Sequence, residues 1–125
     1  MSNSSSNSRS GGMGVADEVV QVASPQGLSL VVTCDLDFER AERVAEALAR
    51  CDRGPVTLDL TRCQFIDSTG IGVLVDTLRT YQDRGIEVRA VRVRPSVFEV
   101  LEIVGAVDVF GRNLFAIEDG TIGRP

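Results

Sequence analysis

The fold is decided by Val56-Thr57-Leu58-Asp59-Leu60-Thr61-Arg62-Cys63-Gln64-Phe65-Ile66-Asp67-Ser68-Thr69-Gly70-Ile71-Gly72-Val73-Leu74-Val75. Apolar and polar side chains alternate over residues 56–60, which predicts a central strand that continues after a short turn into Phe65-Ile66. Apolar residues then recur at helical spacing, which predicts a helix ending at about Gln82 with Gly85 as its C-cap. The Asp67-Ser68-Thr69-Gly70 cluster falls at the expected helix N-terminus.

Two β-rich runs and a helical pattern precede this stretch. Residues 19–23 and 28–34 are rich in valine and leucine, and Ser24-Pro25-Gln26-Gly27 joins them, which predicts a hairpin. Asp37 is the expected cap of the helix that follows. Its apolar face is formed by Phe38, Ala41, Val44, Ala45 and Leu48.

The chain beyond residue 85 returns to strand and helix patterns. Residues 86–91 alternate with a period of two, which predicts a strand. Pro95 is expected to open a helix that Gly105 ends, with a shared apolar face of Val97, Leu101 and Val104. Residues 114–117 are expected to add a last short strand.

Strands therefore alternate with helices after one hairpin. This order predicts an α/β fold with a mixed, mostly parallel β-sheet and helices packed against it. A chain of 125 residues is long enough for one core. We expect residues 1–14 to be a flexible Ser/Gly-rich tail, residues 15–119 to be the folded domain, and residues 120–125 to fray.

The charge and hydropathy of the chain exclude several classes of partner. A formal net charge of −5 argues against nucleic acid, because such binding depends on basic residues that neutralise phosphates. No apolar run approaches the roughly 20 residues that span a bilayer, and the polar N-terminus lacks a signal sequence. We expect a cytoplasmic protein without a membrane partner, present as a monomer or weak dimer.

The side chains that support most enzymes are missing. The chain has no histidine, which removes the commonest general base and transition-metal ligand. The three cysteines (Cys34, Cys51 and Cys63) are odd in number and lack C-x-x-C spacing, which disfavours a disulfide framework or a zinc site. We expect neither an enzyme nor a metal or other cofactor.

The stretch from Val56 to Val75 resembles the signature of the STAS family, as found in anti-sigma factor antagonists. In that family a strand reading V-x-L-D-L leads through F-I-D-S-[ST]-G to a helix beginning [LI]-G-V-L, and every position matches here. The resemblance extends to Asp35-Leu36-Asp37 and covers roughly residues 18–112. Cys34 departs from the family, which usually has glycine there. The helix that many members carry at the end is shortened here.

The resemblance implies a regulator that works by partner switching. The unphosphorylated antagonist binds an anti-sigma factor and releases its sigma factor. The anti-sigma factor, acting as an ATP-dependent serine kinase, then phosphorylates Ser68 and frees itself, and a PP2C-type phosphatase resets the system. Thr69 is the alternative phosphoacceptor. The residues implied in partner binding are Asp35, Leu36, Asp37, Asp67, Ser68, Thr69, Gly70, Ile71 and Gly72.

The residues around Ser68 favour a switch on physical grounds as well. A helix N-terminus offers free N–H groups and positive potential, so it tolerates a phosphate. Asp67 is already negative, and no basic residue lies within four positions downstream, so the added charge would oppose a partner at that surface. Gly70 and Gly72 are expected to let the backbone of a kinase approach closely.

Several alternatives stay open. Asp67, Ser68 and Thr69 could simply cap a helix, and the domain could be a non-switching interaction module or, less in keeping with its composition, a small enzyme or ligand carrier. Asp35 and Asp37 could bind a metal, and the cysteines could sense redox state. The basic residues Arg89, Arg92 and Arg94 are interpreted as the solvent face of an edge strand.

Overall fold

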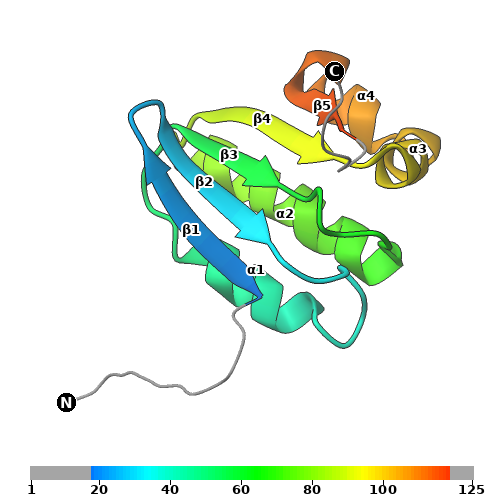
Figure 1. The fold of residues 1–125 in the computed structure, drawn as a ribbon. Coiled ribbons are helices and arrows are strands. Elements are labelled where there is room, and N and C mark those ends of the chain that lie inside the picture. Colours follow the sequence, from blue (N-terminus) through cyan, green and yellow to red (C-terminus); the bar gives the residue numbers. More distant parts are fainter. Residues whose placement is uncertain (1–17, 119–125) are drawn as a thin grey trace.

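The computed structural model describes residues 18–118, and these form one five-stranded sheet with its helices gathered on one face and at one end (Figure 1). The elements in chain order are β1 (Val19–Ser24), β2 (Gly27–Val32), α1 (Ala41–Ala49), β3 (Val56–Asp59), α2 (Ser68–Asp83), β4 (Val88–Val93), α3 (Pro95–Ile103), α4 (Ala106–Phe110), the 3-10 turn η1 (Arg112–Leu114) and β5 (Phe115–Ile117). The predicted tail at 1–14 and frayed end at 120–125 lie outside the described residues.

The sheet has the predicted mixed topology. Its strands follow the order β1-β2-β3-β4-β5. β1 and β2 form the predicted antiparallel hairpin, and the three other neighbouring pairs are parallel. Parallel neighbours need a crossover, which helices provide here. Figure 1 shows α1 and α2 side by side behind the sheet, with α3 and α4 near β4 and β5.

The core lies between the sheet and the two long helices. The side chains that fill it are at most 1% exposed and are mostly aliphatic: Leu30, Val32, Val44, Leu48, Val56, Leu58, Leu74, Leu78, Tyr81, Val91 and Val93. Tyr81 is the one aromatic residue among them, and its hydroxyl donates to the Leu48 carbonyl oxygen at 2.5 Å. That bond joins α2 to the end of α1.

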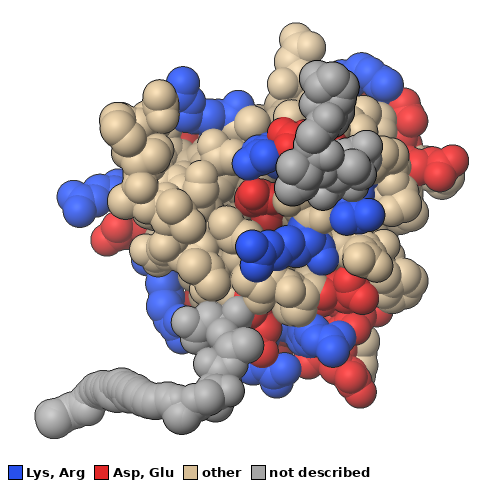
Figure 2. Space-filling view, viewed as in Figure 1, with Lys and Arg blue, Asp and Glu red and all other residues tan. Residues whose placement is uncertain are grey.

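The opposite face of the sheet carries charge across its centre (Figure 2). Arg92 on β4 forms an ion pair with Asp59 on β3 at 3.2 Å and two hydrogen bonds with Glu118 just beyond β5. The hydrogen bond with Glu118 raises the pKa of the Arg92 guanidinium above its ordinary value. A single arginine therefore ties three neighbouring strands together.

The prediction that Arg89, Arg92 and Arg94 lie on an edge strand is wrong, because their strand β4 lies between β3 and β5. The last short strand expected at residues 114–117 is confirmed as β5, and it pairs with β4, which the sequence pattern alone does not indicate. The other two arginines of the run bind backbone across the sheet. Arg89 donates to the Gln26 carbonyl oxygen at 3.0 Å, and Arg94 donates to the Thr61 carbonyl oxygen at 3.2 Å.

The central strand is shorter than predicted. Asp59 Oδ1 accepts the Thr61 N–H at 2.9 Å and the Thr61 hydroxyl at 2.6 Å, which turns the chain after β3. The expected continuation through Phe65-Ile66 is reduced to a single parallel bridge between Ile66 and Leu36. Phe65 itself is 54% exposed.

The first helix starts later than predicted. α1 begins at Ala41, its N-cap position is Arg40, and no side chain caps it. Asp37 Oδ1 instead accepts the Arg40 N–H at 3.0 Å, so Asp37 closes a turn that precedes the helix. Phe38 was expected on the buried helical face and is 76% exposed. Both differences arise because the turn takes up the residues assigned to the first helical turn.

The later helices follow the sequence closely. The C-cap of α2 is Arg84, one residue before the predicted Gly85, and Gly85 follows it with a left-handed φ of 73°. Pro95 is the first residue of α3, as predicted. Val97 and Leu101 are buried, whereas Val104 is 53% exposed, so the predicted face is wrong at that position. The five-residue α4 is too short to show a helical period and was not predicted.

Truncating Leu58 to alanine is expected to lower the free energy of unfolding by about 2–5 kcal/mol, since the side chain is 1% exposed at the centre of the sheet. Urea unfolding followed by circular dichroism measures this. Val20→Ala is the control, because Val20 lies on the same sheet but is 40% exposed and is expected to cost less than about 1 kcal/mol. Equal losses in both variants would contradict the assigned core.

Candidate functional site

Two loops meet at the carboxyl ends of β2 and β3. We name residues 33–40 the Leu36 loop and residues 65–70 the Ser68 turn. The Leu36 N–H donates to the Phe65 carbonyl oxygen at 3.0 Å, and the Asp67 N–H donates to the Leu36 carbonyl oxygen at 3.2 Å. Leu36 is fully buried. The backbone of each loop therefore holds the other in place.

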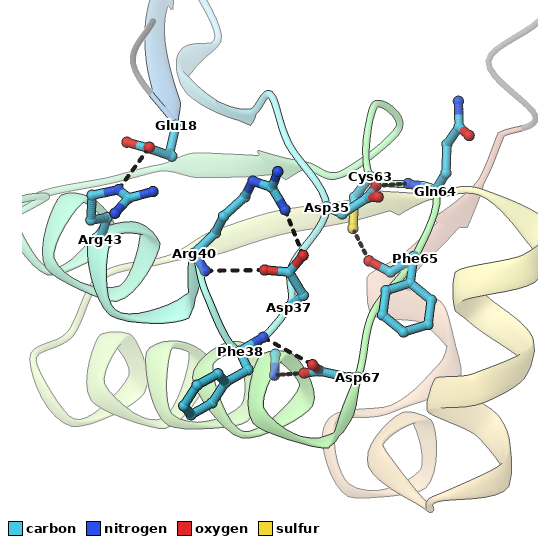
Figure 3. A network of polar contacts seen from close by, with 11 residues as sticks. Glu18, Asp35, Asp37, Phe38, Arg40, Arg43, Cys63, Gln64, Phe65 and Asp67 are labelled. Carbon is cyan, nitrogen blue, oxygen red and sulfur yellow. Dashed lines mark hydrogen bonds and ion pairs between the residues drawn. The ribbon is translucent and has the colours of Figure 1, made fainter. Parts of the chain in front are cut away.

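Two carboxylates add cross-links between these loops (Figure 3). Asp67 Oδ1 accepts the Gly70 N–H at 2.9 Å, and its Oδ2 accepts the Phe38 N–H at 2.9 Å. Asp35 Oδ1 accepts the Gln64 N–H at 2.9 Å. Asp67 is thus the N-cap of α2 and also a bridge to the Leu36 loop. The capping interpretation is confirmed for Asp67, and capping leaves the hydroxyl of Ser68 available.

Gly70 has a different role from the one predicted. A Cβ on Gly70 would lie 2.0 Å from the Leu36 carbonyl oxygen, far inside van der Waals contact. The residue is buried. Its lack of a side chain lets α2 pack against the Leu36 loop, so the expectation that Gly70 makes room for a partner backbone is wrong. A Cβ on Gly72 would meet nothing within 4 Å, and Gly72 is exposed.

The nine predicted site residues fall into three groups. Ser68, Thr69 and Gly72 are exposed on the first turns of α2. The three aspartates are half-buried and are engaged in loop contacts. The remaining three face inward: Leu36 and Gly70 are buried, and Ile71 packs partly buried against the core. The structure brings all of them together at one end of the sheet, but only the first group is fully available to a partner.

Two aromatic residues at this surface were missed. Phe38 is 76% exposed in the Leu36 loop and Phe65 is 54% exposed in the Ser68 turn. Figure 3 shows both rings projecting from these loops, with Asp67 between them. Phe38 was assigned to the apolar face of a helix and Phe65 to the end of a strand, although Phe65 follows a polar turn and Phe38 follows an aspartate. Those neighbouring turn residues were the available signal.

The electrostatics of the surface are dominated by its carboxylates. Asp37 is paired with Arg40 at 2.5 Å. Within residues 18–118 no ion pair reaches Asp67 or Asp35. Asp67 therefore presents a carboxylate that is hydrogen-bonded to backbone but not neutralised. A second negative group placed beside it would meet repulsion rather than a compensating charge.

The same contacts bear on the metal interpretation of Asp35 and Asp37. Each carboxylate already binds a backbone N–H, and Asp37 also binds a guanidinium. Across the part of the chain that the structure describes, no three histidine, cysteine or acidic side chains gather as metal ligands would. These two residues shape the loops.

The cysteines near the site are held as thiols. Burial raises the pKa of Cys63 to about 11, and its Sγ donates to the Phe65 carbonyl oxygen at 3.0 Å. Burial is also the main cause that raises the pKa of Cys34, which is half-buried. A redox sensor needs accessible thiolate. The protonated state of these side chains favours a packing role.

The comparisons with known proteins identify the family of the chain. Residues 18–119 match the STAS domain family. The chain belongs to the STAS domain family. This STAS domain is similar to the anti-sigma-B factor antagonists of Listeria monocytogenes serovar 1/2a and Listeria innocua serovar 6a. It is 31% identical to each over 85 residues, which are 66% of this chain and 75% of the relative.

A solved structure supports the fold. The sulfate transporter family protein from Wolinella succinogenes superimposes with a TM-score of 0.58 at 19% identity, covering 73% of this chain and 75% of that one. At this identity the likeness concerns the fold of the STAS domain alone. No helix among residues 18–118 of this chain is long and apolar enough to cross a membrane.

Gly70→Ala and Gly72→Ala are expected to have opposite effects. The new methyl group at Gly70 would clash with the Leu36 carbonyl oxygen, which should lower the free energy of unfolding by about 2–3 kcal/mol. At Gly72 it meets open space inside a helix and should raise that energy by about 0.5–1 kcal/mol. Thermal and urea unfolding of both variants measure the difference. A neutral Gly70→Ala would contradict the close packing of the two loops.

Thiol labelling tests the state of the cysteines. At pH 8 a thiol with a pKa of about 11 is roughly one part in a thousand thiolate, so buried Cys63 should not react with Ellman's reagent in the folded protein. Half-buried Cys34 should react slowly in the folded protein. In about 6 M guanidinium, a concentration that unfolds even very stable domains, all three thiols should react. Rapid labelling of Cys63 in the native state would restore the redox interpretation.

Proposed function

We propose that this STAS domain is an anti-sigma factor antagonist whose binding to its anti-sigma factor is switched off by phosphorylation of Ser68. One observation carries the proposal: an exposed serine begins α2 directly beside the un-neutralised carboxylate of Asp67. The likeness to the two Listeria antagonists supports the choice of partner. The role is that of a ligand and a substrate, not of a catalyst.

The proposed binding surface has aromatic anchors around the switch. Phe38 and Phe65 are large, exposed side chains on loops that are fixed to each other by hydrogen bonds. Rigid aromatic residues lose little entropy on binding and often supply most of the energy of an interface. Ser68, with a small side chain, and Gly72, with none, lie at the same end of the domain and let a partner approach.

Phosphorylation would change this surface more than the fold. Asp67 already accepts the Gly70 N–H, so the phosphate would rely on the remaining N–H groups of the first helical turn and on the positive end of the helix dipole. It would add about −1.5 to −2 charge units next to Asp67. A partner surface that fits the neutral hydroxyl would meet that charge. If the repulsion costs about 2.7 kcal/mol of binding free energy, the affinity falls about a hundredfold.

The reactions belong to the partners. The anti-sigma factor, as an ATP-dependent serine kinase, would transfer the γ-phosphoryl group of ATP to Ser68 Oγ, releasing ADP and the hydroxyl proton. A PP2C-type phosphatase would hydrolyse the ester with water, returning the serine and inorganic phosphate. The alternative is a non-switching interaction module in a signalling assembly, for which Ser68 would be only a helix residue.

Substitutions at Ser68 are expected to separate these two functions. Ser68→Asp should weaken binding to the anti-sigma factor at least tenfold, because it adds a carboxylate beside Asp67. Ser68→Ala should bind like the original chain and resist phosphorylation. Thr69→Ala is the matched control, one exposed position further along α2, and should retain both properties. Isothermal titration calorimetry measures the affinity, and mass spectrometry after incubation with kinase and ATP maps the phosphate.

Two outcomes would contradict phosphorylation of Ser68 as the switch. If Ser68→Asp binds as tightly as the original chain, the domain is the non-switching module. If the phosphate maps to Thr69 and Thr69→Ala abolishes it, the switch residue is Thr69.

Removing either exposed ring is expected to weaken partner binding. Phe38→Ala and Phe65→Ala should each reduce affinity about tenfold or more, with little change in the urea midpoint because the rings are mostly exposed. Ile103→Ala is the control, since Ile103 is 77% exposed but lies at the end of α3. Loss of binding in the control with none in the two loop variants would move the partner surface to α3.

A further inference from the structure

β1 is an edge strand with little to bury. Five of its six residues are exposed, although four of the six are valine or alanine. Its inner neighbour is β2, and no strand among residues 18–118 pairs with its other side. The strand therefore presents a row of backbone N–H and C=O groups together with apolar side chains.

The usual protections of an edge strand are missing from β1. Natural sheets blunt such edges with charged residues, prolines, bulges or very short strands. Between Val19 and Ser24 there is no charged residue and no proline, and the pairing with β2 runs over all six residues without a shift in register. The opposite edge of the sheet differs, because β5 has only three residues. An unprotected edge of this length fits a strand from outside the domain.

The hydrogen bonds of the hairpin determine which groups point outward. The Thr33 N–H donates to the Glu18 carbonyl oxygen at 2.9 Å, which makes Glu18 and Thr33 a hydrogen-bonded pair. Pairs of this type alternate along an antiparallel ladder, so Val20 and Val22 direct their backbone groups toward β2. The backbone groups of Val19, Gln21 and Ala23 point away from the sheet.

We propose that β1 pairs antiparallel with β1 of a second copy of this chain, about a two-fold axis at Gln21. In this register Gln21 faces Gln21 of the second copy, and Val19 faces Ala23 of the second copy. All three outward residues then occupy hydrogen-bonded positions. The two five-stranded sheets would join into one continuous sheet of ten strands.

The side chains favour the same register. Val20 would lie opposite Val22 of the second copy on the open face of the sheet, where they are now 40% and 49% exposed. Within each copy, Val31 of β2 lies opposite Val20 of β1 and extends this apolar strip toward the centre of the sheet. A shift by one residue would instead pair Val20 with Ala23 and join the open face of one copy to the helical face of the other. The two-fold register buries apolar surface on both copies.

Charge at the two ends of the edge does not oppose this pairing. Glu18 precedes β1 and is already paired with Arg43 at 2.8 Å. At the other end of β1, Ser24 lines a cavity together with Arg50, Asp52 and Arg53. In the proposed register Glu18 of one copy lies opposite Ser24 of the other, so an ion pair, and not a free like charge, meets this end.

The proposed dimer leaves the partner surface open. Ser68 follows β3, which is separated from β1 by β2. Both copies could therefore present their Ser68 turns at once. The dimer does not depend on phosphorylation, so it can be tested independently of the proposed function.

Sedimentation equilibrium of the full chain tests the dimer. From about 10 μM to about 1 mM, the weight-average mass should rise from 13.4 kDa toward twice that value. Val22→Lys should return it to the monomer mass, because it places a charge on the paired edge. Val109→Lys is the matched control on α4, where Val109 is 62% exposed, and should still dimerise. A monomer at all concentrations, or a dimer lost only in Val109→Lys, would overturn the proposal.

Cross-linking tests the register. Gln21→Cys should form an intermolecular disulfide when oxidised with copper phenanthroline in air, because hydrogen-bonded partners have Cα atoms about 5.5 Å apart. Ala23→Cys is the control, since the two copies of residue 23 would lie about 14 Å apart. The unmodified chain controls for Cys34, Cys51 and Cys63. Equal cross-linking of both variants would overturn the two-fold register at Gln21.

Discussion

The carboxylate of Asp67 connects the two loops on which the rest of this surface depends. One oxygen caps α2 through the Gly70 N–H, and the other holds the Phe38 N–H. The contact works only because Gly70 has no side chain and lets the Leu36 carbonyl oxygen approach. The same carboxylate therefore both caps the helix and holds the two loops together. It fixes the position of Ser68 relative to the neighbouring loop.

This arrangement explains how a small modification could have a large effect on binding. The serine opens a sixteen-residue helix that Asp67 caps, so its backbone has little freedom to move away from an added phosphate. Asp67 lies beside it without an ion-pair partner among the described residues. New charge would be felt by a docking protein more than by the core, which is aliphatic and lies beneath the sheet.

The pattern of residues 56–75 was sufficient to predict a strand followed by a helix with Ser68 at its N-terminus. Strand alternation and helical spacing are local properties, and both persist in β3 and α2. The roles of Phe38 and Gly70 could not be predicted in this way, because each depends on a loop about thirty residues distant. The place of β4 inside the sheet was missed for a similar reason, since the pattern of the predicted last strand does not show which strand it pairs with.

Phosphate on Ser68 is proposed to alter the binding surface and to leave the fold intact. The most direct measurement is the affinity of the chain phosphorylated only at Ser68 for its anti-sigma factor, by calorimetry, with urea unfolding of the same sample. We expect an affinity at least about a hundredfold below that of the unphosphorylated chain and an unfolding free energy within about 1 kcal/mol of it. Equal affinities, or a loss of affinity accompanied by unfolding, would contradict the account.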